Sequence, residues 1–385
     1  MRYKLKDIFD LQMGKTPSRN NSEYWNTEDY KWISIADLGK TGKYISETKE
    51  YLSESAVTDS GIKVIPANTV VMSFKLSIGK TAITAEDMYS NEAIMAFHDR
   101  HVVDILPEYI YYMFKYKNWD EGSNKAVMGK TLNKATLSEV EIDICSMEEQ
   151  IEIVNVLDKM MAVLEGRKAE LALLDNLIKA RFVEMFGDVI HNSKKWQVCL
   201  FAEITSSRLG KMLDAKQQTG RNSYPYLANF NVQWFRFNLE NLNKMDFDEK
   251  DRAEFELREG DLLVCEGGEI GRCAVWHNEL QPCFFQKALH RVRCNHQIIL
   301  PDYLAWWFRY NCDYGGFSAL AGAKATIAHL PGAKLKQLQV AVPPMELQEQ
   351  FAVFVAQTDK SKVAVQKALD EAQLLFDSLM QEYFG

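Results

Sequence analysis

The chain has 385 residues, of which 47% are hydrophobic and 25% are charged, and its formal net charge is −8. This length predicts two or three domains that can bury a core, and the acidic balance argues against a general polyanion-binding protein. The sequence contains neither a run of eighteen apolar residues nor a signal-peptide pattern, so we expect no transmembrane span and a cytoplasmic location.

The first predicted block, residues 1–147, combines strands and helices. The runs "TVVMSF" (69–74) and "KTAITA" (80–85) are rich in β-forming residues and flank a glycine, which predicts a hairpin. The segment "LPEYIYYMFKY" (106–116) begins with proline and an acid, a favourable helix start. Because this segment is aromatic on most faces, we expect a buried core helix rather than a base-stacking surface.

A helical segment, residues 148–188, follows this block. It lacks proline, and apolar residues recur in it every seven positions, which predicts a helix with a heptad seam. Residues 345–385 repeat this pattern, with Lys362 as the one interruption, and either helix would be about 60 Å long. We expect the two seams to pack on each other or on a partner; the alternative is that each helix lies on its own domain. The seam residues are Leu157, Leu164, Leu171, Ile178, Met185, Val355, Leu369, Phe376 and Tyr383.

The block between the helices, residues 189–344, repeats the first block. "DLLVCEGGEIGRCAV" (261–275) matches "TVVMSFKLSIGKTAI" (69–83), "LPDYLAWWFRY" (300–310) matches 106–116, and "LKQLQVAV" (335–342) matches "LSEVEIDI" (137–144). The matches keep their order, with offsets of 192, 194 and 198 residues. The two blocks carry net charges of −3 and +3, and the two helical segments carry −4 each. The sequence therefore predicts a domain-sized duplication.

The sequence offers no catalytic constellation. "GKT" occurs at 14, 79 and 129, but the first glycine of a phosphate-binding GxxxxGK[ST] loop would fall on Phe9, Phe74 or Asn124. "VPPM" (342–345) lacks the flanking residues of a methyltransferase loop, and no nuclease motif follows "PDYLAWW". The seven cysteines include no CxxC pair, which favours reduced buried thiols. A metal site is the alternative, because histidines 277, 290 and 296 lie among these cysteines.

Basic and polar residues on glycine-containing turns are the candidate binding residues. Glycine turns let a backbone approach phosphates, and Arg, Lys and Asn side chains contact phosphates and base edges. Any one of them alone is more often a solvated loop residue, but the same turns recur in both blocks. We predict nucleic-acid contacts for Lys15, Thr16, Ser18, Arg19, Lys75, Lys80, Lys130, Asn133, Lys134, Arg208, Lys211, Lys216, Arg221, Asn222, Arg272 and Lys324.

The order of these motifs, repeated twice, resembles the specificity subunit of type I restriction–modification systems. The resemblance rests on "GKTPS", the turns "SIGKTAI" and "EIGRCAV", the "LPxYxxxxF" helix, and "GKTLNKATLSEVEI" before the "EEQ" helix. It implies an α+β fold with pseudo-twofold duplication. Two target-recognition domains (1–147 and 189–344) would be joined by two long antiparallel coiled-coil helices, a central (148–188) and a distal one (345–385).

The same resemblance implies the function. Each recognition domain would read one half of a bipartite, asymmetric site on double-stranded DNA, and the helices would set the spacing and dock two methyltransferase subunits. Translocase–nuclease subunits would join for cleavage. S-adenosylmethionine, ATP and Mg²⁺ would be bound by partner subunits, with no cofactor, metal or catalytic residue in this chain. The second copy has "GKML" where the first has "GKTP", so we expect its first loop to contact DNA differently.

Two alternative functions stay open at this point. A self-contained DNA methyltransferase or nuclease would carry its own recognition domains, although its motifs are missing. A coiled-coil adaptor without a nucleic-acid role would account for the helices but not for two large, loop-rich blocks.

Overall fold

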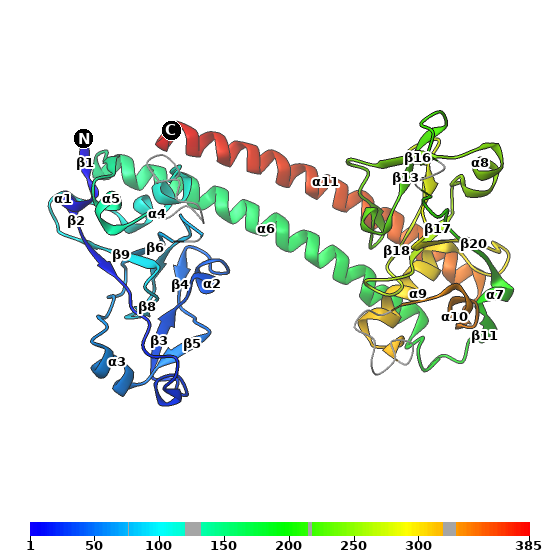
Figure 1. The fold of residues 1–385 in the computed structure, drawn as a ribbon, viewed down its shortest axis with the longest axis horizontal. Helices are drawn as coiled ribbons and strands as arrows, with labels where there is room; N and C mark the ends of the chain where they lie inside the picture. The colour runs from blue at the N-terminus through cyan, green and yellow to red at the C-terminus, as the bar shows by residue number, and fades with distance from the viewer. Residues whose placement is uncertain (76, 120–131, 215–217, 319–328) are drawn as a thin grey trace. The chain divides into compact units, whose positions relative to one another are not determined.

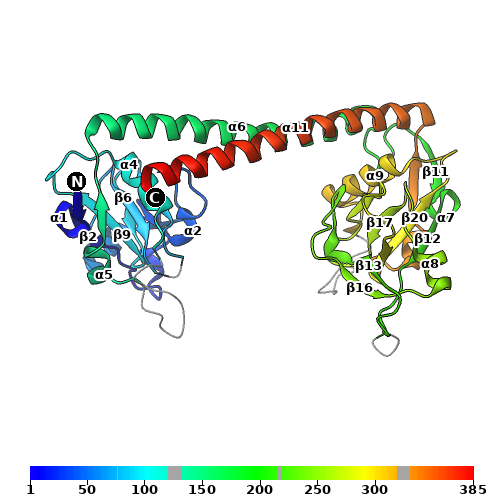
Figure 2. The same cartoon turned by 90° about the horizontal axis from the view of Figure 1, so that it is seen from above.

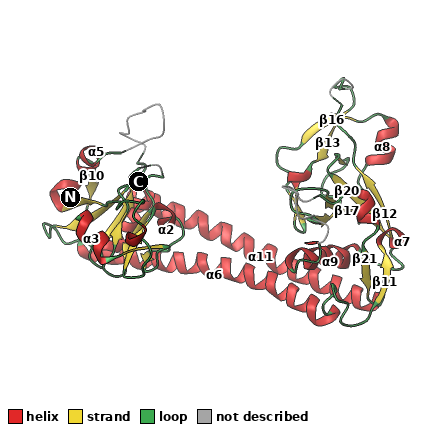
Figure 3. Ribbon diagram, turned by 60° about the horizontal axis from the view of Figure 1, so that its bottom comes forward, coloured by secondary structure: helices red, strands yellow, loops and turns green. Residues whose placement is uncertain are grey.

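The computed structural model of the chain describes residues 1–75, 77–119, 132–214, 218–318 and 329–385. The chain divides into two compact units (Figure 1). Unit 1 consists of Met1–Ala169 and Gln366–Gly385, and unit 2 consists of Glu170–Val365. Each unit combines strands and helices, so the α+β class is confirmed (Figure 3).

Unit 1 is built around a five-stranded sheet of order β2-β9-β6-β7-β4, with a three-stranded sheet β5-β3-β8 and a two-stranded sheet β1-β10. Its elements before the first long helix are β1 (Arg2–Lys4), α1 (Leu5–Ile8), β2 (Phe9–Met13), η1 (Ser22–Tyr24), β3 (Tyr30–Ile33), α2 (Ile35–Leu38), β4 (Tyr44–Ile45), β5 (Glu50–Leu52), α3 (Glu54–Ser60), β6 (Val70–Ser73), β7 (Thr81–Thr84), β8 (Tyr89–Ser90), β9 (Ile94–Asp99), α4 (Pro107–Tyr116), α5 (Lys134–Ser138) and β10 (Glu141–Asp143).

Unit 2 repeats this arrangement with a four-stranded sheet β12-β20-β17-β18, a three-stranded sheet β16-β13-β19 and a two-stranded sheet β11-β21. Its elements between the long helices are β11 (Gln197–Leu200), α7 (Phe201–Ile204), β12 (Thr205–Leu209), β13 (Ser223–Leu227), η3 (Asn229–Asn231), β14 (Val232–Gln233), β15 (Arg236–Phe237), β16 (Asn243–Asp246), α8 (Glu249–Phe255), β17 (Leu262–Cys265), β18 (Cys273–Val275), β19 (Phe284–Phe285), β20 (Leu289–Cys294), α9 (Pro301–Asp313), α10 (Gly332–Lys336) and β21 (Gln339–Val342).

The glycine hairpin predicted in both copies is confirmed. β6 pairs antiparallel with β7 in unit 1, and β17 pairs antiparallel with β18 in unit 2. Gly79 and Gly271 occupy matching places in the two turns and have positive φ angles of 87° and 77°. Residues with a Cβ rarely adopt a positive φ angle, so each turn requires glycine at this position.

The repeated aromatic segments form buried helices, as predicted. α4 and α9 both begin with proline in the first turn, where the missing N–H costs no hydrogen bond. Tyr109 of α4 donates its hydroxyl hydrogen to the carbonyl of Asp143 (3.3 Å), and Tyr303 of α9 donates to the carbonyl of Ala341 (2.6 Å). Each aromatic helix is thereby fixed to the strand that precedes a long helix.

The two long helices are α6 (Met147–Phe186) and α11 (Met345–Phe384) (Figure 2). In unit 1, Leu157 of α6 and Met380 of α11 belong to one apolar cluster. In unit 2, Phe182 of α6 packs edge-on against Phe351 of α11, with 5.5 Å between ring centroids. The first half of α6 thus packs against the last turns of α11 in unit 1, and the last turns of α6 pack against the first turns of α11 in unit 2. Within each unit the helices run antiparallel and also pack on that unit's sheet domain.

None of the nine predicted seam residues is exposed. Those classed as buried are Leu157, Leu164, Ile178, Met185 and Val355, and those partly buried are Leu171, Leu369, Phe376 and Tyr383. Full burial of a Val, Leu, Ile or Met side chain stabilises a fold by about 1.5–3 kcal/mol, so the five buried residues contribute most.

The interruption of the seam by Lys362 has a partner on the other helix. Its ammonium lies 2.8 Å from Asp175 of α6 and 3.1 Å from Asp359. Burial acts to lower the pKa of Lys362, but the hydrogen bond to Asp175 and the charge of Asp359 together raise it above its ordinary value. The lysine therefore stays charged and joins the two helices by an ion pair.

Candidate nucleic-acid interface

A glycine holds the first candidate loop against the sheet domain in each copy. A Cβ on Gly14 would lie 2.3 Å from the carbonyl oxygens of Ser90 and Asn91, and one on Gly210 would lie 2.4 Å from that of Gln286. The next amide is bonded in both copies: Lys15 N–H donates to Ser90 (2.8 Å), and the corresponding amide of the second copy donates to Phe285 (3.2 Å). The shared "GK" motif therefore fixes where each loop leaves its strand.

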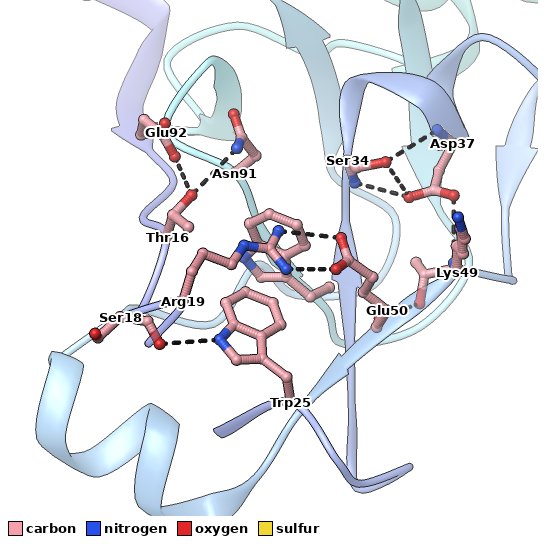
Figure 4. A network of polar contacts seen from close by, with 12 residues as sticks. Thr16, Ser18, Arg19, Trp25, Ser34, Asp37, Lys49, Glu50, Asn91 and Glu92 are labelled. Carbon is pink, nitrogen blue, oxygen red and sulfur yellow. Dashed lines mark hydrogen bonds and ion pairs between the residues drawn. The ribbon is translucent and has the colours of Figure 1, made fainter. Parts of the chain in front are cut away.

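In unit 1 this loop is organised by a stacked arginine (Figure 4). The Arg19 guanidinium lies 3.7 Å from the ring centroid of Trp25 and 4.9 Å from that of Trp32, and it forms an ion pair with Glu50. Trp25 in turn donates its indole N–H to the carbonyl of Ser18 (3.1 Å). Stacking on two tryptophans holds the guanidinium in place while about half of the side chain stays exposed.

The other three candidate side chains of this loop differ in whether they are hydrogen-bonded within the fold. The Lys15 ammonium donates to the carbonyl of Ser60, and the Thr16 hydroxyl donates to Glu92. Ser18 is exposed. Four predicted residues, Lys15, Thr16, Ser18 and Arg19, are thus brought together in one loop, of which Arg19 is the most rigidly held.

A second group of candidates lies on the glycine turn of unit 1. The Lys75 ammonium lies 5.1 Å from the ring centroid of Phe74, and Lys80 follows the turn glycine. The amide of Leu132 donates to the carbonyl of Phe74 (3.2 Å), so the segment that carries Asn133 and Lys134 begins beside this turn. Asn133 caps α5 by accepting a hydrogen bond from the Thr136 amide (2.8 Å). Lys134 is exposed in the first turn of this helix.

In unit 2 a buried carboxylate shapes the loop that carries Arg221 and Asn222. Asp246 accepts hydrogen bonds from the Thr219 hydroxyl and the Gly220 amide, both at 2.8 Å. The hydrogen bond from the Thr219 hydroxyl and those from the loop amides lower the pKa of Asp246. The carboxylate is therefore ionised at neutral pH and holds the loop, while Arg221 and Asn222 are exposed.

Other candidates in unit 2 are already engaged within the fold. The Lys211 ammonium forms an ion pair with Asp251 and donates to the carbonyl of Asp246 (2.7 Å). The Arg208 guanidinium pairs with Glu254. Contact with a phosphate would require these groups to exchange an internal partner for an external one.

Arg272, the counterpart of Lys80, is engaged in the same way. It donates to the backbone carbonyl of Asn229 (3.1 Å) and to the side-chain oxygen of that residue (3.0 Å), and its side chain is only 18% exposed. Three further candidates, Lys130, Lys216 and Lys324, lie outside the described residues.

Sequence reasoning missed two pairs of matching residues. Lys115 and Arg309 were passed over because they belong to the aromatic helices, which were interpreted as core. Gln150 and Gln348 lie near the start of the long helices, 198 residues apart, and each is fully buried. The signal for the glutamines was present, since the same polar residue recurs at a helix position that faces the core.

The cysteines form no obvious reactive site. All seven are free thiols, and burial raises the pKa of Cys265 to about 11 and that of Cys294 to about 12. A thiol with a raised pKa is protonated at neutral pH and is therefore a poor nucleophile or metal ligand. Among the described residues no three His, Cys, Asp or Glu side chains are grouped in a way that could hold a metal ion. The helices described also include none with the length and apolar character of a membrane span.

The arrangement defines a class of protein: a duplicated α+β chain whose two domains carry unlike loops at matching positions and are joined by two long helices. The model of the family "Type I restriction modification DNA specificity domain" matches residues 1–173 and 193–372. The chain belongs to this family.

Individual relatives agree with the family. The chain is 31% identical over 192 residues to the type I restriction enzyme MjaIX specificity subunit of Methanocaldococcus jannaschii; the match covers 48% of this chain and 43% of that protein. It is 29% identical over 171 residues to the EcoR124I/EcoR124II specificity subunit of Escherichia coli, covering 42% of this chain and 41% of that protein. The matched region thus spans less than half the length of either relative.

Two solved structures share the fold over the whole chain. One is the S subunit of a type I restriction–modification system from M. genitalium, with a TM-score of 0.57, 14% identity and coverage of 100% of this chain and 96% of that chain. The other comes from a study of complex assembly and conformational transition of the type I system, with a TM-score of 0.60, 14% identity and coverage of 100% and 97%. The predicted architecture of two similar domains and two long helices is thereby confirmed.

Proposed function

We propose that this chain is the DNA sequence-recognition subunit of a type I restriction–modification complex. Each sheet domain, residues 1–147 and 189–344, reads one half of a bipartite, asymmetric site on double-stranded DNA. The long helices, 148–188 and 345–385, set the distance between the halves and dock two methyltransferase subunits. Membership of the specificity-domain family supports this role.

The observation that carries the proposal is duplication with divergence. The two copies share the glycine hairpin, the aromatic helix and the bonded amide after Gly14 and Gly210. The side chains on that frame differ: Thr16 and Pro17 follow Lys15 in unit 1, whereas Met212 and Leu213 follow Lys211 in unit 2. Thr16 donates its hydroxyl hydrogen to Glu92, whereas Met212 is exposed. Two similar frames with unlike contact residues suit two half-sites of unlike sequence.

The chemistry belongs to partner subunits in this proposal. The chain itself supplies no catalytic residue, and S-adenosylmethionine, ATP and Mg²⁺ are bound by the methyltransferase and translocase–nuclease subunits. The complex works in the cytoplasm, where the DNA is. The net charge of −8 fits this division, because partners would then share the phosphate contacts.

Apolar side chains on the outer faces of the long helices support docking. In unit 1, Leu374 of α11 is 71% exposed; in unit 2, Leu173 of α6 is 66% and Val363 of α11 is 70% exposed. Such exposed apolar side chains are available to pack against a partner protein.

Reconstitution tests the proposal. A type I methyltransferase subunit from the same organism is purified with and without the chain, and transfer of labelled methyl groups to adenines of host DNA lacking the modification is measured. We expect transfer only when both proteins are present. Methyl transfer or DNA cleavage by the chain alone, or the same site specificity from the methyltransferase alone, would refute the proposal.

A further inference from the structure

Unit 1 contains a hollow of about 330 Å³ with two lysines on its wall. Lys80 comes from the end of the glycine turn between β6 and β7, and Lys115 comes from the last turn of α4. Gly39, Thr41 and Gly79 are among the remaining lining residues. Two segments that are far apart in the sequence therefore bring cations to one place.

Within the part of the chain that the structure describes, no carboxylate lines this hollow. Lys115 donates to the hydroxyl of Tyr111 (2.9 Å), a neutral partner. The Lys80 ammonium lies over Gly39, where a Cβ would come within 2.7 Å of it. Lysines that line the same hollow carry like charges, which repel each other, and a bound anion would relieve that repulsion.

Acids close to this region are already occupied. Asp158 of α6 accepts from the Lys43 ammonium (2.6 Å) and from the Tyr112 hydroxyl (2.5 Å). Glu108 accepts from the Tyr44 hydroxyl. Neither carboxylate is among the residues that line the hollow.

In the second copy, carboxylates of the same unit neutralise the cations at these two positions. Arg272 and Arg309 correspond to Lys80 and Lys115 at offsets of 192 and 194 residues. Asp313 lies 2.7 Å from the Arg309 guanidinium, and Glu269 lies 3.8 Å from Arg272 and 3.9 Å from Arg309.

The acids of the second copy have no acidic counterpart in the first. At the same offsets, Ser77 stands at the position of Glu269, and Trp119 stands at that of Asp313. Both units therefore carry a pair of cations at these positions, and the acids that neutralise the pair in unit 2 are replaced by Ser77 and Trp119 in unit 1.

We propose that Lys80 and Lys115 hold one phosphate of the DNA backbone in this hollow, whereas Arg272 and Arg309 stabilise the fold of unit 2 without contacting DNA. This inference rests on the proposed function and refines it. A phosphate suits the hollow because lysine ammonium groups bind it as point charges without a fixed geometry. The Thr41 and Thr81 hydroxyls donate to backbone carbonyls at 2.8 and 3.0 Å, so the lysines are the groups that would bind the anion.

Salt dependence of DNA binding tests this. The full chain, assembled with its methyltransferase, is titrated with target duplex at several salt concentrations. One phosphate contact contributes about 0.9 to the slope of log affinity against log salt. We therefore expect Lys80→Gln/Lys115→Gln to lower the slope by about one and to weaken binding about tenfold at 0.1 M salt. Lys80→Arg/Lys115→Arg is expected to keep the slope.

Arg309→Gln is the matched variant in the other copy. It is expected to lower the melting temperature of the chain and to leave the slope unchanged, because its guanidinium is neutralised within unit 2. The single variants Lys80→Gln and Lys115→Gln should each show part of the loss, with melting temperatures close to that of the wild type.

Three results would overturn the inference. One is a Lys80→Gln/Lys115→Gln complex with the wild-type slope. Another is an equal loss of slope in Arg309→Gln. The third is that the lysine variants lose affinity for the methyltransferase while the salt dependence of DNA binding is unchanged. The lysines would then bind a carboxylate of the methyltransferase rather than a phosphate. If the wild-type complex failed to bind DNA at all, the proposed function itself would be refuted, which is a distinguishable outcome.

Discussion

Gln150 and Gln348 show how a single side chain fixes an aromatic helix to a long helix. The Gln150 side-chain oxygen accepts from the amide of Leu106 (2.9 Å), and its nitrogen donates to the carbonyls of Asp104 (3.0 Å) and Cys145 (3.1 Å). Gln348 repeats these three bonds in unit 2, at 2.9, 3.0 and 2.8 Å. Both glutamines are fully buried, so each bond replaces one that water would otherwise provide.

Loss of one of these glutamines should therefore be costly. We expect Gln348→Ala to lower the free energy of unfolding by about 2–4 kcal/mol, because it leaves one buried amide and two carbonyls without partners. Gln350→Ala, two residues along the same helix and exposed, is the matched control and should change stability by less than about 0.5 kcal/mol. Equal effects of the two changes in urea denaturation would show that the buried bonds contribute little.

At the scale of elements, α6 contains one glycine that its packing does not require. Gly166 is exposed, and a Cβ built on it meets nothing within 4 Å. Glycine in a helix interior is less favourable than alanine by roughly 0.5–1 kcal/mol. The position is therefore free of the steric demands that hold Gly14 and Gly210.

This difference between glycines is measurable. We expect Gly166→Ala to raise the free energy of unfolding by about 0.5–1 kcal/mol. Gly210→Ala should lower it, because the added methyl would overlap a backbone carbonyl that cannot move away cheaply. A destabilising Gly166→Ala, measured by thermal unfolding, would show that α6 bends or makes a contact at this residue.

At the scale of the whole molecule, the exposed apolar residues of the long helices are the proposed contacts with the methyltransferase. Replacing Leu173 and Val363, two exposed residues of unit 2, with glutamate should weaken binding of the methyltransferase by at least about tenfold, because assembly would bury two carboxylates without partners. The melting temperature of the free chain should change little. Val102→Glu, at a residue that is 59% exposed in a loop of unit 1, is the matched control. Unchanged binding in calorimetric titrations would place the docking surface elsewhere.

Much of the fold could be predicted from the sequence, because its signals are local or repeated. Strand-forming runs around a glycine predicted both hairpins, and a seven-residue apolar period predicted both long helices. Two features of the copies were not visible in this way: β4 joins the main sheet of unit 1, and the short β14–β15 hairpin occurs in unit 2. Both lie outside the motifs that repeat between the two copies.

The candidate site was predicted less well than the fold, for a physical reason. Whether a lysine or arginine on a turn is free depends on carboxylates and carbonyls that are distant in the chain. Lys211 is paired with Asp251, 40 residues away, and Arg272 is bonded to Asn229, 43 residues away. Residue type and spacing place a cation on a turn, but only the fold reveals its partner. The DNA contacts themselves stay a prediction.

The most direct test of the account is a map of methylated adenines in cells that carry a chimeric gene. Residues 1–147 are replaced by the matching block of another family member with a different target, and residues 148–385 are left unchanged. Because each unit has its own core and its own contact loops, we predict that one half of the methylated motif changes while the other half and the spacing between them persist. A motif altered in both halves would contradict the account, because the two domains would then not read DNA independently.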